Sequence, residues 1–193
     1  MNNKRRNIIK IAIDSPAAAG AGTISKSLSN YYNLFYLDTG KIYRFIAFLK
    51  INFPKKFNLS FLKKKILKLK IKDLDNPNLI SDNVGFQASI IAKNKSIRKL
   101  VHKYQVNCAY NPPRKYDGSC LDGRDITYKI VPDADFKFFI TANIKTRAQR
   151  RFKELKKLKK SIKYEKVLKS IKNAIKVTII VEFHPLRKQK IRY

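Results

Sequence analysis

The chain has 193 residues and a formal net charge of +31, from 44 Lys and Arg residues against 13 Asp and Glu residues. Hydrophobic residues make up 44% of the sequence, enough for the core of one domain with a small insert. No apolar run approaches membrane-spanning length, and two cysteines without a metal-ligand pattern exclude a disulfide framework. We therefore expect a globular cytoplasmic protein with reduced thiols.

The positive charge would ordinarily favour nucleic-acid binding. The lysines, however, are spread along the chain and are densest at 56–72 and 153–172, where their spacing is typical of solvated helix faces. Heavy use of Lys, Ile and Asn, with 6 Gly and no Trp, is also typical of an AT-rich genome. We expect nucleotide phosphates, rather than nucleic acid, to be the acidic ligands.

The N-terminal segment has the pattern of a strand, a loop of small residues and a helix. An apolar run at 8–13 predicts a buried parallel strand, and residues 22–32 predict a helix. In such a loop, backbone N–H groups and the helix N-terminus can hold phosphate oxygens. The alternative is an ordinary strand-to-helix turn. The candidate phosphate loop comprises Ser15, Pro16, Ala17, Ala18, Ala19, Gly20, Ala21, Gly22 and Thr23.

Downstream, apolar strands alternate with helical periods, which predicts an α/β fold with a parallel sheet. The further strands are expected at 34–37, 119–121 and 136–141. The further helices are expected at 41–50, 61–69, 85–93, 96–109, 144–158 and 164–172.

Several short motifs occur along these elements in a fixed order. They are DTGKIYR at 38–44, NVGFQASIIA at 83–92, DGRD at 122–125, PDADFKFFITA at 132–142 and RAQRRF at 147–152. In this order and at these spacings, the chain closely resembles bacterial cytidylate kinases over residues 7 to about 172. The DTG-x-x-YR and DGRD segments are the most specific of the motifs.

The resemblance implies the fold of a P-loop nucleoside monophosphate kinase, with a parallel sheet flanked by helices. It implies a core at 1–172, with an insert on the monophosphate side at about 51–82, and an aberrant lid and tail segment at 173–193. It also implies transfer of the γ-phosphoryl group of ATP to CMP or dCMP, with Mg²⁺, by a monomeric enzyme of pyrimidine nucleotide metabolism.

The chemistry of the arginines agrees with these expectations, because a guanidinium fork binds two phosphate oxygens. Arg124 follows an apolar strand and so lies at its carboxyl end, where open α/β sheets bind ligands. A surface salt bridge to Asp122 or Asp125 is the alternative. Arg147, Arg150 and Arg151 share one helix face by their spacing, which is ordinarily a solvated face.

The resemblance also implies the site residues, none of which is a metal ligand. The expected catalytic residues are Arg124, Arg147 and Arg151, with Arg150 on the same helix face. The expected CMP-binding residues are Asp38, Thr39, Tyr43, Arg44, Ser89, Gln105 and Asp125.

Two departures from the family pattern bear on activity. The pattern of a P-loop is G-x-x-x-x-G-K followed by a hydroxyl residue. Here Ser15 stands at the first glycine and Ala21 replaces the lysine that reaches the β- and γ-phosphates. Val106 replaces an arginine that binds phosphate in the family. The loop is therefore degenerate, and its catalysis is expected to be impaired.

The tail is the third departure. The family has a charged segment after Lys172, whereas residues 173–184 are mostly apolar before Pro185-Leu returns in register. A back-translation of 173–184, read in another frame, encodes Arg-Asp-Lys-Ser-Asp-Tyr-Asn-Arg, which matches the missing pattern. We therefore expect a frameshift-like C-terminus that lacks the last strand and helix. The alternative is a true strand at 177–183, because the run is β-branched.

Three functions compete on these observations. The first is a (d)CMP kinase. The second is a pseudokinase that binds nucleotides without catalysis, which the three departures favour for this particular chain. The third is a basic module that binds nucleic acid.

Overall fold

The structure is a computed structural model that describes residues 7–158 and 161–180. By its internal contacts the chain divides into two units, residues 1–141 and 142–193. Of the seven α-helices in the described residues, five lie with the sheet in the first unit and two lie in the second. The expected boundary at residue 172 remains a prediction.

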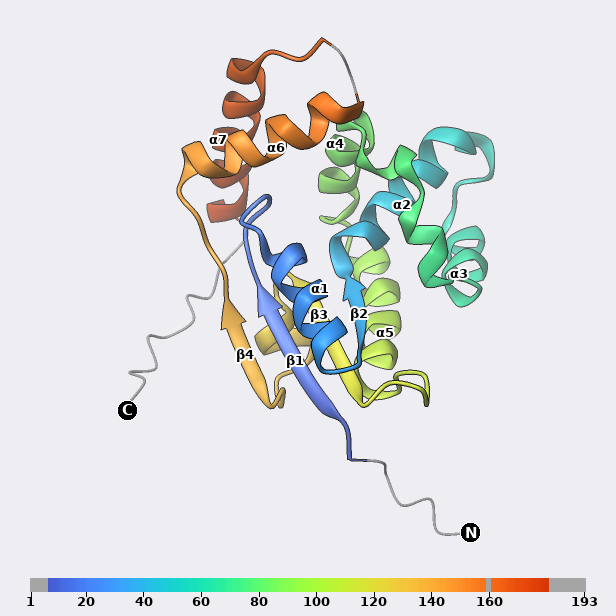
Figure 1. The fold of residues 1–193 in the computed structure, drawn as a ribbon. Helices are drawn as coiled ribbons and strands as arrows, with labels where there is room; N and C mark the ends of the chain where they lie inside the picture. Colours follow the sequence, from blue (N-terminus) through green and yellow to red (C-terminus); the bar gives the residue numbers. More distant parts are fainter. Residues whose placement is uncertain (1–6, 159–160, 181–193) are drawn as a thin grey trace. The chain divides into compact units, whose positions relative to one another are not determined.

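The first unit is built on a four-stranded parallel sheet with the strand order β2-β3-β1-β4 (Figure 1). The strands are β1 (Ile9–Asp14), β2 (Leu34–Asp38), β3 (Gly118–Gly123) and β4 (Phe136–Phe139). All four expected strands are confirmed within about three residues at their ends. The α/β class expected from the alternating pattern is confirmed as well.

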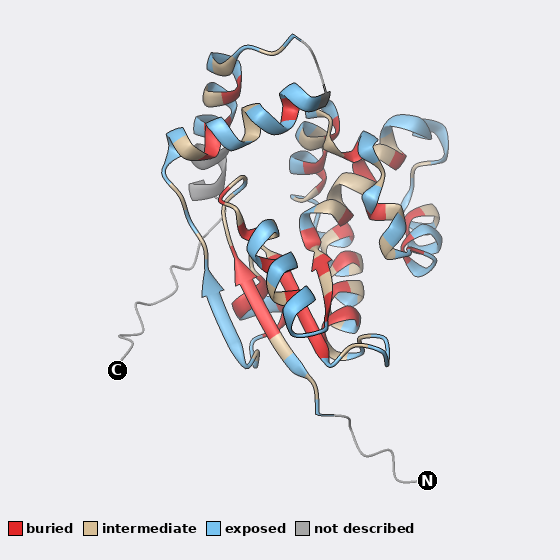
Figure 2. Ribbon diagram, in the orientation of Figure 1, coloured by how far each residue is buried: buried red, intermediate tan, exposed pale blue. Residues whose placement is uncertain are grey.

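The buried central strands explain why these segments pair in parallel. Ile13 and Leu121 are completely enclosed, as a parallel strand with both faces covered requires (Figure 2). The register places Ile13 beside Asp122, and Asp38 beside the same residue from the other side. The apolar parts of three neighbouring strands are thus followed by polar residues, which lie together where the strands end at their carboxyl side.

Five α-helices accompany this sheet in the first unit. They are α1 (Ala21–Tyr31), α2 (Thr39–Asn52), α3 (Leu59–Leu67), α4 (Asp82–Ile91) and α5 (Lys95–Tyr110). Side chains of Asp38, Asn58, Ser81 and Asn94 cap the last four of these helices at their N-termini. Each helix overlaps the range expected from the sequence.

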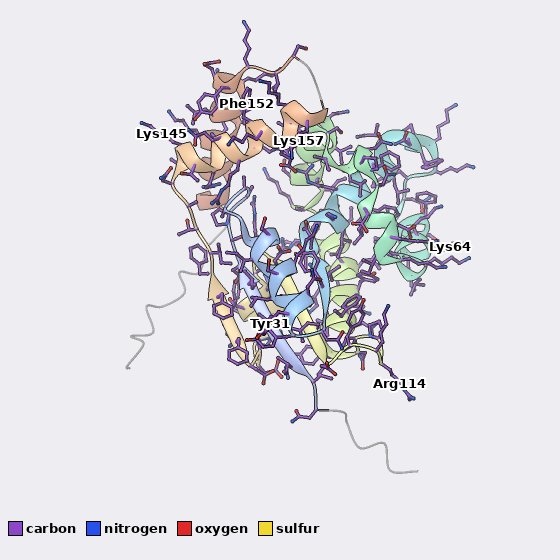
Figure 3. All side chains as sticks on the ribbon, viewed as in Figure 1. Tyr31, Lys64, Arg114, Lys145, Phe152 and Lys157 are labelled. Atoms are coloured by element: carbon purple, nitrogen blue, oxygen red, sulfur yellow. The ribbon has the colours of Figure 1, made fainter. Side chains whose placement is uncertain are left out.

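The expected insert at 51–82 contains α3 and three short 3₁₀ segments, Pro54–Lys56, Ile71–Asp75 and Pro77–Ile80. It contributes Leu62, Ile66 and Leu74 to the main apolar core, together with residues of α2 and α5. Its lysines lie on the outside, and Figure 3 shows the side chain of Lys64 directed away from α3. The lysine-rich segment therefore has the solvated helix face that its spacing predicts.

The second unit pairs α6 (Ile144–Leu158) with α7 (Tyr164–Ile180). Ala148 and Leu155 of α6 and Val167 and Ile171 of α7 are buried, and the ring of Phe152 meets that of Tyr164 edge-on at 5.8 Å. The alternative of a strand at 177–183 is wrong for 177–180, which continue α7, and 181–183 lie outside the described residues. Helical backbone has prevailed there over the β propensity of a branched run.

Within the part of the chain that the structure describes, none of the helices combines the length and apolar composition that a membrane crossing demands.

Candidate active site

The candidate phosphate loop joins the end of β1 to the start of α1, as expected. Gly20 precedes the first helical residue and has a φ of 101°, a conformation that glycine adopts without strain. Ala18 also has a positive φ, of 61°, where a side chain carries a steric cost. Since Gly20 has no side chain to cap α1, the first amide groups of the helix suit an anionic ligand.

Asp14 fastens this loop to the segment that follows DGRD. Its carboxylate accepts hydrogen bonds from the backbone N–H of Ile126 at 2.7 Å and of Thr127 at 3.2 Å, and from the Thr127 hydroxyl at 2.5 Å. Burial raises the pKa of Asp14, and these hydrogen bonds oppose that shift. The Ser15 N–H also donates to the carbonyl of Gly123 at 2.8 Å. The phosphate loop and the DGRD motif therefore form one hydrogen-bonded structure.

Asp38 and Asp122 face each other across β2 and β3 at the same edge. The Tyr36 hydroxyl donates to Asp122 Oδ2 at 3.2 Å, and the Thr39 hydroxyl donates to the Asp122 carbonyl at 2.8 Å. Burial, with the nearby Asp38 carboxylate, raises the pKa of Asp122 to about 7. Asp122 Oδ1 is buried and accepts no hydrogen bond from the described residues. An unsatisfied carboxylate oxygen of this kind suits a hard divalent cation.

This environment predicts how stability depends on pH. The pKa of Asp122 is raised in the folded chain from 3.8 to about 7, so the native state holds a proton that the unfolded state has lost. The stabilisation that this proton provides is complete below pH 3.8 and is lost as the pH rises through about 7. In Asp122→Asn we expect a shallower fall in unfolding free energy between pH 4 and 7. Burial also raises the pKa of Asp38, so the variant keeps the part of this pH dependence that Asp38 causes.

Urea unfolding at a series of pH values measures this slope. Asp117→Asn is a matched control, because that side chain is exposed and accepts a hydrogen bond from the Asn33 side-chain amide at 2.9 Å. The control is expected to keep the slope of the unaltered chain. An Asp122→Asn slope equal to that of the control would contradict the assignment.

A cavity of about 300 Å³ lies between α2, α5 and the segment after β3. Of the residues expected from the sequence, Tyr43, Gln105 and Asp125 line this cavity. The complete lining is Tyr43, Arg98, Lys99, His102, Gln105, Asp125, Lys129 and Ile130. Seven of these eight residues carry a polar or charged group, and the surface that they present to the cavity is mostly apolar.

Arg98 and Asp125 form an ion pair within this wall. Arg98 Nη2 lies 2.6 Å from Asp125 Oδ2, and Arg98 Nη1 reaches the carbonyl of Ala92 at 3.4 Å. Asp125 has a φ of 72°, a strained conformation that an aspartate tolerates better than most residues. Burial raises the pKa of the neighbouring Tyr43 to about 12, so its hydroxyl stays protonated. The carboxylate of Asp125 therefore has a fixed orientation at the cavity.

Three other expected residues of the first unit do not line this cavity: Arg44 on α2, Arg124 after β3 and Ser89 on α4. Arg44 Nη1 donates to the carbonyl of Leu79 at 2.8 Å. Arg124 is exposed directly after β3. The Ser89 hydroxyl donates to the carbonyl of Phe86 at 2.7 Å, and Ser89 is not among the cavity-lining residues. Val106, at the position where the resemblance implies an arginine, packs against the apolar core.

Arg147, Arg150 and Arg151 lie on α6 in the second unit. Arg147 is buried, and Arg151 Nη1 pairs with Glu154 at 2.7 Å across one turn of the helix. The shared helix face expected from their spacing is consistent with α6, and their approach to the phosphate loop remains a prediction.

Sequence reasoning missed Asp14, Tyr36, Arg98 and Asp122 as parts of this site. Two signals were available. Asp14 and Asp122 each end an apolar strand, at the sheet edge where ligands bind. Arg98, His102 and Gln105 follow one another at helical spacing, which places them on one face of α5.

Comparisons of the sequence with known proteins show which family the chain belongs to. The family model described as cytidylate kinase matches residues 11–190. The cytidylate kinase of Bartonella tribocorum is 38% identical over 180 residues, covering 92% of this chain and 81% of that protein. The cytidylate kinases of Mesomycoplasma hyopneumoniae strain 7448 and Clostridium botulinum strain Loch Maree are each 34% identical, covering 93% and 94% of this chain and 82% and 87% of theirs. The resemblance read from the motifs is confirmed, and the chain belongs to the cytidylate kinase family.

Proposed function

We propose that this chain transfers the γ-phosphoryl group of ATP to CMP or dCMP, giving ADP and the cytidine diphosphate. Membership of the family makes it a kinase that uses nucleotides. The observation that carries the assignment is the junction at Asp14. That carboxylate joins the phosphate loop to the segment beginning at Asp125, and Asp125 in turn lines the acceptor cavity. Donor and acceptor sites thus adjoin the same sheet edge.

On the donor side, phosphoryl transfer needs positive groups and backbone donors around the moving group. The amides of residues 15–23 hold the phosphates of ATP, and α1 adds the favourable end of its dipole. Arg124 follows β3 and stabilises charge on the transferred group. Arg147 and Arg151 of α6, with Arg150 beside them, are proposed as further phosphate ligands on the family resemblance of their motif alone.

On the acceptor side, the Arg98–Asp125 pair presents a fixed carboxylate to the exocyclic amino group of cytosine. Tyr43 and Gln105 complete the cavity around the base, and Ser89 lies on the neighbouring α4. Arg44 holds the monophosphate, while Asp38 and Thr39 at the start of α2 contact the nucleoside.

A Mg²⁺ ion fits this site at Asp122, whose buried Oδ1 is without a partner among the described residues. When bound, it would neutralise charge on the β- and γ-phosphates. The described residues hold no cluster of three or more His, Cys, Asp and Glu side chains placed to bind a metal ion, so phosphates and waters would supply the rest of the coordination. We further propose a monomeric, cytoplasmic protein that does not bind nucleic acid, with a core at 1–172 and an aberrant tail at 173–193.

A nucleotide-binding pseudokinase is the second candidate. It is favoured by Ala21, which places a methyl group where the phosphate-binding lysine belongs. Val106, packed on the core, gives the acceptor phosphate no charge. Catalysis by this chain is therefore expected to be weak, although the acceptor cavity retains its ion pair.

Two measurements on the purified full chain separate these functions. Isothermal titration with CMP tests binding, and formation of CDP from ATP and CMP with Mg²⁺ tests turnover. We expect CMP to bind and CDP to form slowly. Binding without any turnover would identify a pseudokinase, and the absence of both would contradict the proposed site. UMP is the control ligand, because its ring has a carbonyl in place of the amino group that would donate a hydrogen bond to Asp125.

A further inference from the structure

The guanidinium of Arg44 lies directly against the backbone of α4. If Gly85 carried a Cβ atom, that atom would lie 3.1 Å from Arg44 Nη2, 3.2 Å from Nη1 and 3.4 Å from Cζ. All three distances are shorter than or at the edge of ordinary van der Waals contact. The same guanidinium donates to the carbonyl of Leu79 at 2.8 Å. The group is thus held against one helix and fixed by the carbonyl of another segment.

A glycine at this position is otherwise unfavourable for the helix. Gly85 is the fourth residue of α4, and glycine within a helix costs stability relative to alanine. Its backbone does not have the positive φ that would require glycine, because Gly20 is the glycine with that conformation in the described chain. Space for the Arg44 side chain is the remaining physical reason for a glycine here.

We infer that Gly85 is a positioning residue for Arg44, and that its missing side chain sets where the guanidinium meets the acceptor monophosphate. The inference rests on the proposed role of Arg44 in holding that phosphate. A methyl group on residue 85 would push the guanidinium away by a few tenths of an ångström. Because the guanidinium fork binds two oxygens at once, a small displacement weakens both hydrogen bonds.

The first test measures acceptor binding. Gly85→Ala is expected to weaken CMP binding about fivefold, the scale of a small misplacement, with ATP binding unchanged. In an Arg44→Lys background the same change is expected to have no effect on CMP binding, since the slender lysine side chain leaves room for a methyl group. Asn83→Ala is the matched control, an exposed position on the same helix, and is expected to leave CMP binding unchanged.

The second test is independent of nucleotide binding. Replacing glycine by alanine within a helix ordinarily raises the thermal midpoint. We expect a smaller rise from Gly85→Ala when Arg44 is present than in an Arg44→Ala background, because only the first has the crowded contact. Equal rises in both backgrounds, or unchanged CMP affinity in Gly85→Ala, would overturn the inference. A chain that binds no CMP would refute the proposed function instead, and the thermal comparison would still decide the role of Gly85.

Discussion

Restoring lysine at position 21 alone is expected to leave this chain a poor kinase. The lysine of a phosphate loop reaches the β- and γ-phosphates, and loss of one such group typically costs about 3 kcal/mol of transition-state stabilisation. Ala21 accounts for one missing charge. Val106, packed against the core, accounts for a second, and the apolar residues after Asn173 replace a charged segment of the family. Groups that act together are not additive, so a single repair leaves an incomplete cluster.

A coupled assay of ADP formation on three proteins measures this effect. The proteins are the unaltered chain, Ala21→Lys, and Ala21→Lys with Val106→Arg and a tail of family sequence. We expect clear activity only in the third, exceeding the first by a factor of at least about 10³. Full recovery in Ala21→Lys, or rapid turnover by the unaltered chain, would refute this account of the departures.

The second large effect concerns stability. In Asp14→Ala, the N–H groups of Ile126 and Thr127 would lose the carboxylate that accepts their hydrogen bonds in a buried site. Each stranded buried donor costs roughly 1–3 kcal/mol, so the unfolding free energy is expected to fall by about 3 kcal/mol. Urea denaturation at pH 7 measures the difference.

Asp14→Asn is the graded comparison, because its side-chain carbonyl can still accept one of these hydrogen bonds. Its unfolding free energy should lie between that of the alanine variant and that of the unaltered chain. A loss below about 1 kcal/mol in Asp14→Ala would mean that water or a rearranged loop satisfies these donors. The junction would then not be the element that holds the two parts of the site together.

Local pattern was sufficient for most of the fold. The apolar runs before Asp14 and Asp122 predicted strands because buried parallel strands are apolar on both faces. The tail shows the limit of such reasoning. Residues 177–180 favour a strand by their branched side chains, yet they continue a helix that packs through Val167 and Ile171. Packing earlier in α7 outweighed the local preference.

The site was harder to predict than the fold, because its contacts join distant segments. The ion pair between Arg98 and Asp125 spans 27 positions, and the bonds from Asp14 to Thr127 span 113. Helical spacing places Arg98 on one face of α5 with His102 and Gln105, but the partner of its guanidinium lies on a distant segment. Arg147 and Arg151 were predicted by motif, and their place relative to the loop depends on the arrangement of two separate units.

Because β4 is exposed, we expect the strands of the sheet to unfold locally in a definite order. All four residues of β4 are exposed, whereas β1 is enclosed over its last four residues and β3 over its first five. Backbone amides in the described sheet should therefore exchange with solvent first at β4 and last at β1 and β3. The chain continues from β4 into the unit that carries α6 and its arginines. Local opening at β4 would leave the hydrogen bonds of the Asp14 carboxylate to Ile126 and Thr127 intact, since none of these residues belongs to β4.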